Sequence, residues 1–418
     1  MQNIRKAILI FIIFIDLYGF YIVKFPEAIN VYIRWNKMLL LGIGIFLYII
    51  GLVKRNRIVS DICNEYIRPY TVCIVGSLLL LCIFTKISSP ETSINQLIIE
   101  SSPYLLIILV SFYLRIMVHD GGIDGFHNVI NYTIVVWYIL LIIQSNIYSQ
   151  TGKIFMTESQ SHEWIWQRDY GIRIGLGSIA NIMILYNFYI IITRKKKKLF
   201  SYIQLALGLY CSVVVQQTRM YIITVILSMI IMFAYSGSVT SKKIRRGVLL
   251  LVGVIMLSGN VIQNYVGSFS IISDKGSSTV ARLGAIEYYM SIFMKNPLFG
   301  FGFTSNSAIR NGGAGYDMTD VGFVGLLAQV GLFSIILYIF IFVRMTYILY
   351  KMKKMQYIDL SYSYMVGLYT FALFTSGSLI MTNHGRAMTI PFLLAIYEFK
   401  YYKYKKFIHN RIGKSSMR

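Results

Sequence analysis

The chain contains 418 residues, of which 56% are hydrophobic and only 14% are charged, and its formal net charge is +23. Soluble globular domains carry roughly 25% charged residues, so this composition excludes an ordinary soluble enzyme. The basic excess does not indicate a nucleic-acid partner either. Such a protein gathers its positive charge on one folded face, whereas Lys and Arg are spread here over many short segments.

Apolar runs recur along the whole sequence and are joined by shorter polar segments. A bilayer interior needs roughly 20 apolar residues per helix, and a helix satisfies its own backbone hydrogen bonds there. We therefore predict an all-α, polytopic integral membrane bundle that forms a single domain over residues 1–418, with about twelve transmembrane helices. The predicted spans are 7–23, 38–53, 70–84, 103–118, 129–147, 172–193, 200–216, 220–236, 248–262, 321–343, 360–382 and 388–400.

The basic residues indicate how the bundle is oriented, because Lys and Arg favour the cytoplasmic loops of membrane proteins. If Arg5 and Lys6 lie in the cytoplasm, the basic clusters at 54–57, 194–198 and 242–246 and the basic C-terminus fall on the same side. Acidic residues show the opposite preference. We expect a multi-pass protein of the bacterial cytoplasmic (inner) membrane with both termini in the cytoplasm.

The segment 263–320, between the ninth and tenth predicted spans, is the one long polar interruption, and the predicted topology makes it an extracytoplasmic loop. Residues 279–296 have one internal breaker, Gly284, and end before Pro297, which predicts a helix. The Gly-rich coil after Pro297 can fold over a ligand but does not specify one, and a shorter outward loop covers 148–171. Apolar residues of the helix recur as in an amphipathic helix on the membrane surface or against the bundle: Val280, Leu283, Ile286, Met290 and Phe293.

Arginine recurs where the predicted topology places extracytoplasmic loops and span ends. A single arginine at such a place is equally well explained as an anchor whose charged group reaches the interface. Several that converge would match phosphate oxygens, because a guanidinium group binds them through paired hydrogen bonds. We expect a lipid-linked diphosphate as the anionic partner of Arg219, Arg282, Arg310 and Arg386.

Two motifs around this loop resemble those of a known superfamily. The first is Lys295-Asn296-Pro297-Leu298-Phe299-Gly300-Phe301-Gly302, and the second runs from Asp320 to Leu332. Together with Thr218-Arg219 at an outward span end and Arg282 on the loop helix, they resemble the O-antigen ligase and Wzy-type polysaccharide polymerase superfamily. Each motif is short, but their order and their placement in the topology are specific. The resemblance covers residues 210–345.

Position 320 separates the two branches of that superfamily. Its ligases carry His where this chain has Asp320, and no His occurs between Gln263 and Asp320. An acidic residue there is familiar in the polymerases. The resemblance therefore implies a polymerase that joins undecaprenyl-diphosphate-linked oligosaccharides into an O-antigen, capsule or exopolysaccharide. The acidic residues of the loop form no convincing carboxylate array, so we expect transfer without a metal or cofactor. The resemblance also implies two partner proteins, a chain-length regulator and a flippase.

Residue chemistry and the resemblance together suggest roles for individual side chains. Arg219 and Arg282 are expected to be catalytic by neutralising the diphosphate, and Asp320 is expected to be the general base. Arginine keeps its proton in proteins, so no arginine qualifies as that base. The alternative for Asp320 is an N-cap of the following span. Substrate-binding roles are expected for Arg310, Arg386, His384 and Asp317. Asp317 is also the second candidate for the base; the alternatives are a solvated loop residue for Asp317 and an interface residue for His384.

Three other functions stay open on the sequence. A ligase would transfer the glycan to a different acceptor. A flippase for lipid-linked oligosaccharides would place charged residues inside its spans, facing a central cavity, but only Asp16 lies clearly within a predicted span. A structural membrane scaffold is the third alternative.

Overall fold

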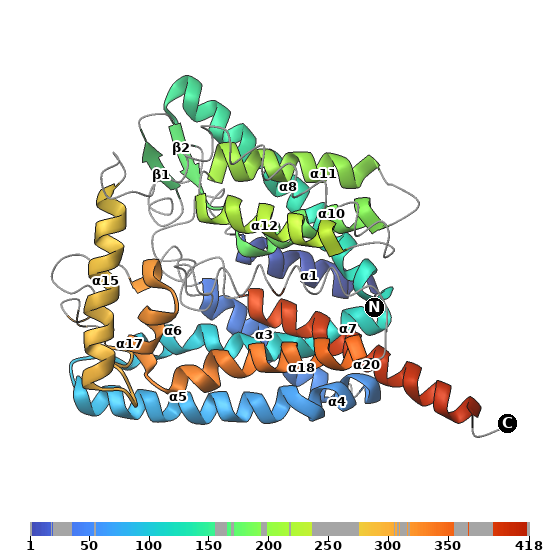
Figure 1. Cartoon of the computed structure of the whole chain (residues 1–418), viewed down its shortest axis with the longest axis horizontal. Helices are drawn as coiled ribbons and strands as arrows, with labels where there is room; N and C mark the ends of the chain where they lie inside the picture. Colours follow the sequence, from blue (N-terminus) through green and yellow to red (C-terminus); the bar gives the residue numbers. More distant parts are fainter. Residues whose placement is uncertain are drawn as a thin grey trace.

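The computed structural model shows helices that run largely along one direction (Figure 1). Five of the described helices are long and apolar enough to cross a membrane: Arg57–Ser88, Ile94–His119, Gly122–Thr151, Leu199–Gln216 and Ile335–Lys353. They identify a predominantly helical membrane protein, in agreement with its composition. The structure describes residues 2–17, 19, 36–53, 56–154, 165–168, 171–193, 199–216, 219–235, 276–304, 306, 309, 316, 318–354, 367 and 388–415.

Ordinary capping residues mark the helix ends in the first part of the chain. Asn56 and Ser93 accept hydrogen bonds from the backbone N–H groups of Val59 and Gln96, both at 3.2 Å, and so satisfy donors that a helix start leaves open. Gly152 ends its helix in the left-handed conformation (φ 66°), the usual role of glycine there. The helices in order are α1 (Gln2–Asp16), α3 (Asn36–Val53), α4 (Arg57–Ile62), η2 (Cys63–Ile67), α5 (Arg68–Ser88), α6 (Ile94–Leu105), η3 (Leu106–Leu109), α7 (Val110–His119) and α8 (Gly122–Thr151).

A β-hairpin interrupts the helices after α8. Strands β1 (Ile165–Arg168) and β2 (Gly171–Ile174) pair antiparallel, with Ile165 opposite Ile174. The predicted span 172–193 is therefore wrong at its start, because a short apolar run fits a strand as well as a helix until its partner is known. The later helices are α10 (Ser178–Thr193), α11 (Leu199–Tyr210), η4 (Cys211–Gln216), α12 (Arg219–Tyr235), α15 (Gly276–Lys295), η5 (Met318–Val321), α17 (Phe323–Val330), η6 (Ile335–Ile339), α18 (Phe340–Lys354) and α20 (Thr389–Ser415).

The predicted continuous span 321–343 is also wrong, because the chain breaks at Gly331. Helix α17 ends there, and Gly331 adopts φ +57°, a conformation that favours glycine. A Cβ at this position would stand 2.4 Å from the carbonyl oxygen of Leu298 and 2.5 Å from that of Pro297. The helix long enough to cross a membrane begins only at Ile335. Residue 320 therefore precedes a short helix and not a membrane span.

Most other predicted spans coincide with helices. The described part of the predicted span 7–23 is helical as far as Asp16. The predicted spans 248–262 and, apart from Gly367, 360–382 lie outside the described residues, so the total of twelve stays a prediction. Helices lie at the predicted spans 38–53, 70–84, 103–118, 129–147, 200–216, 220–236 and 388–400.

The two ends of the bundle differ. At one end, which we call the crosswise end, α15 runs across the other helices; the N-terminus and the end of α20 lie at the opposite, basic end (Figure 1). Ion pairs join residues there that are far apart in sequence: Arg5 with Asp120 at 2.8 Å, and Glu65 with both Arg344 (3.4 Å) and Lys405. All five belong to segments predicted to be cytoplasmic. The structure thus gathers these segments at one end.

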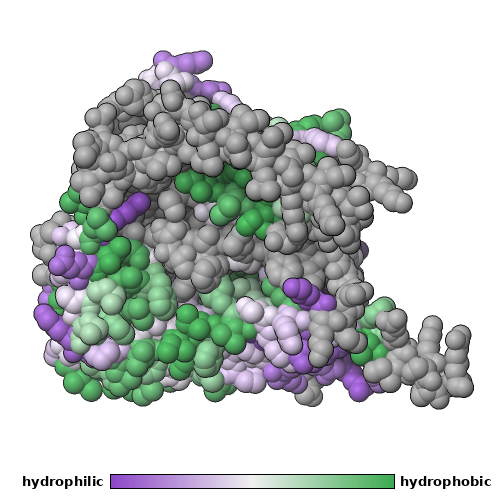
Figure 2. All heavy atoms as spheres, in the orientation of Figure 1, coloured by the Kyte–Doolittle hydropathy of each residue, from purple (hydrophilic) through white to green (hydrophobic). Residues whose placement is uncertain are grey.

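Between the two ends, the described helices present apolar side chains outward (Figure 2). Phe46 of α3 and Val72 of α5 are 63% and 71% exposed. A contiguous exposed apolar surface marks a contact with lipid or another protein. On helices of membrane-spanning length, this surface suits the hydrocarbon core of a bilayer.

Candidate functional site at the crosswise end

Helix α15 lies across the crosswise end and carries Arg282. It coincides with the helix predicted at 279–296. Its buried residues include Ala285 and Tyr289, and the helix packs against α17 and η5. Val280 and Leu283 of the predicted apolar face are 50% and 53% exposed, so this part of the face does not pack against the bundle. Their exposure suits a helix on a membrane surface.

Arg282 is half-buried on α15. Its Nε atom is buried and has no hydrogen-bond acceptor among the residues that the structure describes. A buried donor without an acceptor costs free energy, so most such donors in proteins are satisfied. A bound anion would supply the missing acceptor, because guanidinium groups match the oxygens of carboxylates and phosphates.

Two tyrosines of α15 hold parts of the following loop. The Tyr288 hydroxyl donates to the carbonyl oxygen of Ile309 at 2.8 Å, and the Tyr289 hydroxyl donates to that of Tyr316 at 3.2 Å. Burial raises the pKa of the Tyr288 phenol, which keeps it protonated as a donor. Gly284 permits the close approach of Tyr316, since a Cβ there would stand 2.7 Å from the Tyr316 hydroxyl. No local pattern in the sequence marks these tyrosines as anchors, because their contacts with Ile309 and Tyr316 join residues that are 21 and 27 positions apart.

The glycine motif after Pro297 packs against the C-terminal end of α17. The N–H groups of Phe301 and Gly302 donate to the carbonyl oxygens of Ala328 and Gln329, both at 2.8 Å. These bonds satisfy carbonyls that a helix end leaves open. Gly300 has φ +63°, and a Cβ there would stand 2.2 Å from the carbonyl oxygen of Ala328. Gly300 and Gly302 thus take part in packing against other helices.

The same motif also attaches α17 to α5. The backbone N–H of Phe303 donates to Thr85 Oγ1 at 2.9 Å. The rings of Phe84 and Phe299 stack with their centroids 4.4 Å apart. A Cβ on Gly302 would stand 2.2 Å from Thr85 Oγ1. The motif thus fixes the short helix α17, and with it the crosswise end, to a membrane-spanning helix.

Asp320 lies in η5, immediately before α17. The N-cap of α17 is Gly322, which has no side chain to accept a hydrogen bond. Gly322, and not Asp320, therefore occupies the N-cap position of α17. Because η5 packs against α15, the structure brings the turn that carries Asp320 against the helix that carries Arg282.

Arg219 is the first residue of α12. The preceding element, η4, packs against strand β2, and α12 packs against α10 and η4. This start of α12 lies at the same end of the bundle as α15 (Figure 1). The structure therefore places Arg219 and Arg282 at the same end but in different groups of helices.

The remaining predicted site residues, Arg310, Asp317, His384 and Arg386, lie outside the described residues. The neighbours of the first two, Ile309 and Tyr316, are the residues held by Tyr288 and Tyr289. Within the described residues there is no group of three or more His, Cys, Asp or Glu side chains arranged to hold a metal ion.

Comparison with known proteins gives no family for this chain, since neither a family model nor a curated relative matches it. A functional assignment therefore depends on the motifs and on the geometry of the crosswise end.

Proposed function

We propose that this protein is a polymerase that joins undecaprenyl-diphosphate-linked oligosaccharide repeat units into a surface polysaccharide. The reaction would take place at the outer face of the bacterial cytoplasmic membrane, with the crosswise end facing outward. A flippase would supply the repeat units, and a chain-length regulator would be the second protein partner.

One observation carries the proposal. Arg282 has a buried guanidinium nitrogen without a described acceptor, and it stands on a helix that crosses one end of a membrane bundle. Lipid-linked diphosphates present anionic oxygens where the bilayer meets water. The exposed apolar residues Val280 and Leu283 on the same helix would lie against the lipid portion of such a substrate.

In the proposed reaction, a hydroxyl oxygen of the acceptor sugar attacks the anomeric carbon of the donor. A new carbon–oxygen bond forms as the bond from that carbon to the diphosphate oxygen breaks. Arg282 and Arg219 stabilise the negative charge that develops on the leaving diphosphate. Asp320 accepts the proton of the attacking hydroxyl. Arg310, Arg386, His384 and Asp317 bind and orient the two substrates, and no metal or cofactor takes part.

The proposal is tested by replacing Arg282 with Ala in the organism that makes the polysaccharide. Loss of a donor aimed at developing charge costs about 100-fold or more in rate, so the polymer should disappear while single repeat units still reach the surface. Arg282→Lys should restore only part of the activity, because lysine lacks the paired donors. Glu287→Ala, an exposed residue of the same helix outside the motif, is the matched control and should leave the polymer unchanged.

The Arg282→Ala strain and a deletion strain together separate the rival functions. Polymer of normal length in the Arg282→Ala strain would disprove the proposed role of Arg282. In a deletion strain, lipid-linked repeats that accumulate in the cytoplasm would indicate a flippase, and an intact polymer beside an uncapped acceptor lipid would indicate a ligase.

A further inference from the structure

A cavity of about 220 Å³ lies at the basic end, away from the proposed polymerase site. Its walls come from three segments: the end of α3, the helix that runs from α4 into α5, and the helix Ile94–His119. Both α3 and α5 pack against the third segment. The cavity therefore lies among these three segments.

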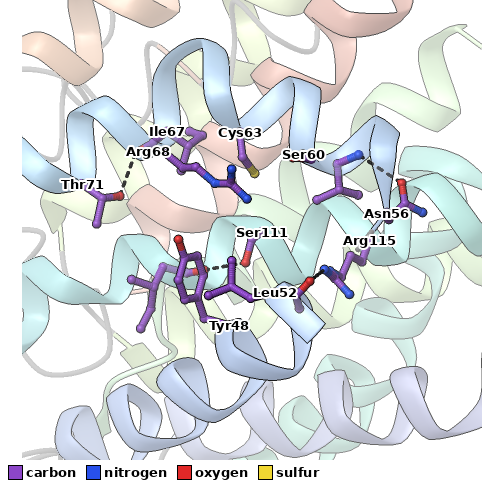
Figure 3. A pocket seen from close by; sticks show the side chains of 13 residues that line it. Tyr48, Leu52, Asn56, Ser60, Cys63, Ile67, Arg68, Thr71, Ser111 and Arg115 are labelled. Carbon is purple, nitrogen blue, oxygen red and sulfur yellow. Dashed lines mark hydrogen bonds between the residues drawn. The ribbon is translucent and has the colours of Figure 1, made fainter. Parts of the chain in front are cut away.

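Two arginines approach the cavity from different helices (Figure 3). Arg68 is the first residue of α5, and Arg115 lies on α7. The Arg115 guanidinium donates to the carbonyl oxygen of Gly51, and the Arg68 guanidinium donates to the side-chain oxygen of Asn64. Both of these acceptors are neutral, and both guanidinium groups belong to residues that line the cavity.

Carboxylates lie on another face of the continuous helix Arg57–Ser88, which carries Arg68. Asp61 and Glu65 line a second cavity, together with Glu398 and Lys405 of α20. The described lining of the arginine cavity contains no carboxylate. It adds the hydroxyl groups of Tyr48 and Ser60, which can donate to an anion. The helix thus separates its charges, with acids towards α20 and arginine towards the cavity.

The helices on both sides of the cavity continue as exposed apolar surfaces. Leu52 lines the cavity and is 50% exposed, and Ile49, one turn earlier on α3, is 54% exposed. On α5, Val72 follows the cavity residue Thr71 and is 71% exposed. A ligand with an anionic head and long apolar chains would place its head between the arginines and its chains along these helices.

We propose that this cavity binds the phosphate of an anionic membrane phospholipid. Arginine donors and hydroxyl groups match phosphate oxygens, and basic pockets between transmembrane helices recognise lipid head groups in this way. The site does not depend on the proposed polymerase activity, since it lies at the other end of the bundle. Inorganic phosphate shares the chemistry of the head group and is the alternative occupant that the experiment separates.

The experiment measures thermal unfolding of the full-length protein in detergent, with increasing concentrations of dihexanoyl phosphatidylglycerol or inorganic phosphate. Phosphatidylglycerol should raise the unfolding temperature of the wild type, and inorganic phosphate should raise it less at equal concentration. Because a hydrogen bond to a charged group contributes substantially to binding, Arg68→Gln should weaken the apparent affinity for the lipid about tenfold. Arg57→Gln is the matched control, since Arg57 is an exposed residue of the same continuous helix and does not line the cavity.

Arg115→Gln tests the second arginine, and Arg115→Lys separates its charge from its hydrogen bond to Gly51. If Arg115→Gln fails to fold, Arg68→Gln and Arg68→Lys still decide the proposal. Equal stabilisation by inorganic phosphate and by the lipid would overturn the lipid assignment in favour of a free phosphate. Wild-type affinity in Arg68→Gln, or equal weakening in Arg57→Gln, would overturn the site itself.

Discussion

The crosswise end and the basic end use arginine in different ways. At the basic end, Arg344 donates to both carboxylate oxygens of Glu398, at 2.7 and 2.9 Å, and Arg5 donates to both oxygens of Asp120, at 3.0 and 2.8 Å. At the crosswise end, the buried Nε of Arg282 has no acceptor among the described residues. Bidentate ion pairs fix the geometry of both partners, whereas an arginine without such a pair can bind an anion from outside the chain.

Aromatic packing strengthens this difference. The Arg344 guanidinium carbon lies 4.8 Å from the ring centroid of Tyr66 and 5.1 Å from that of Tyr401, distances at which a cation is attracted to a ring face. Arg344 therefore joins α18 to both α4–α5 and α20. We conclude that Arg344 holds the fold together, and we propose that Arg282 serves the substrate. Substitutions at the two ends should then affect different measurements.

The largest expected effect on stability comes from Arg344→Ala. It would leave Glu398, whose side chain is 1% exposed, as a buried charge without its main partner, and breaking such a pair costs about 3–5 kcal/mol. We expect a lower unfolding temperature in detergent and reduced amounts of protein in the membrane. Lys353→Ala, an exposed residue of the same helix, should change little. Adding Glu398→Gln to Arg344→Ala should restore part of the loss; no restoration would contradict the explanation.

A smaller effect is expected from Gly300→Ala, which tests the packing of the glycine motif. Alanine would need an unfavourable backbone conformation at φ +63° and would press its Cβ against the carbonyl oxygen of Ala328. Backbone strain alone costs about 1–3 kcal/mol. We expect lower thermal stability and loss of polymer, because α17 and η5 would shift together. Gly76→Ala in α5 is the control: a Cβ there meets nothing within 4 Å, so stability should be unchanged or higher. Equal stability of the two variants would refute the packing role.

Sequence patterns predicted the helices better than they predicted contacts between them. Apolar runs and span ends are local features, so spans such as 129–147 and the loop helix 279–296 coincide with α8 and α15. The break at Gly331 depends instead on contacts with Pro297 and Leu298. These contacts cannot be predicted from the local apolar run. The run 321–343 therefore read as one span although it contains two helices.

The candidate site was predictable to a similar degree. The charge distribution and the motifs placed Arg219, Arg282 and Asp320 at span ends or on the loop, and the described structure has them at one end of the bundle. The amino-acid sequence alone did not reveal that Gly300 and Gly302 pack against α17 and α5, because this packing depends on positive φ angles and on close approach of the backbone. In the same way, no motif in the sequence links Arg68 with Arg115, and only the packing of separate helices brings them to one cavity.

The smallest expected effect comes from Tyr288→Phe, which removes one hydrogen bond, to the carbonyl oxygen of Ile309, and keeps the ring. A typical hydrogen bond contributes about 0.5–1.5 kcal/mol, so global stability should fall only slightly. If the tyrosines hold the loop over the substrate, amide exchange around Ile309 should become faster and polymer synthesis should slow severalfold. Tyr350→Phe on α18, an exposed residue, should change neither measurement. Faster exchange without slower synthesis would show that this part of the loop takes no part in the reaction and would leave Arg219, Arg282 and Asp320 as the site.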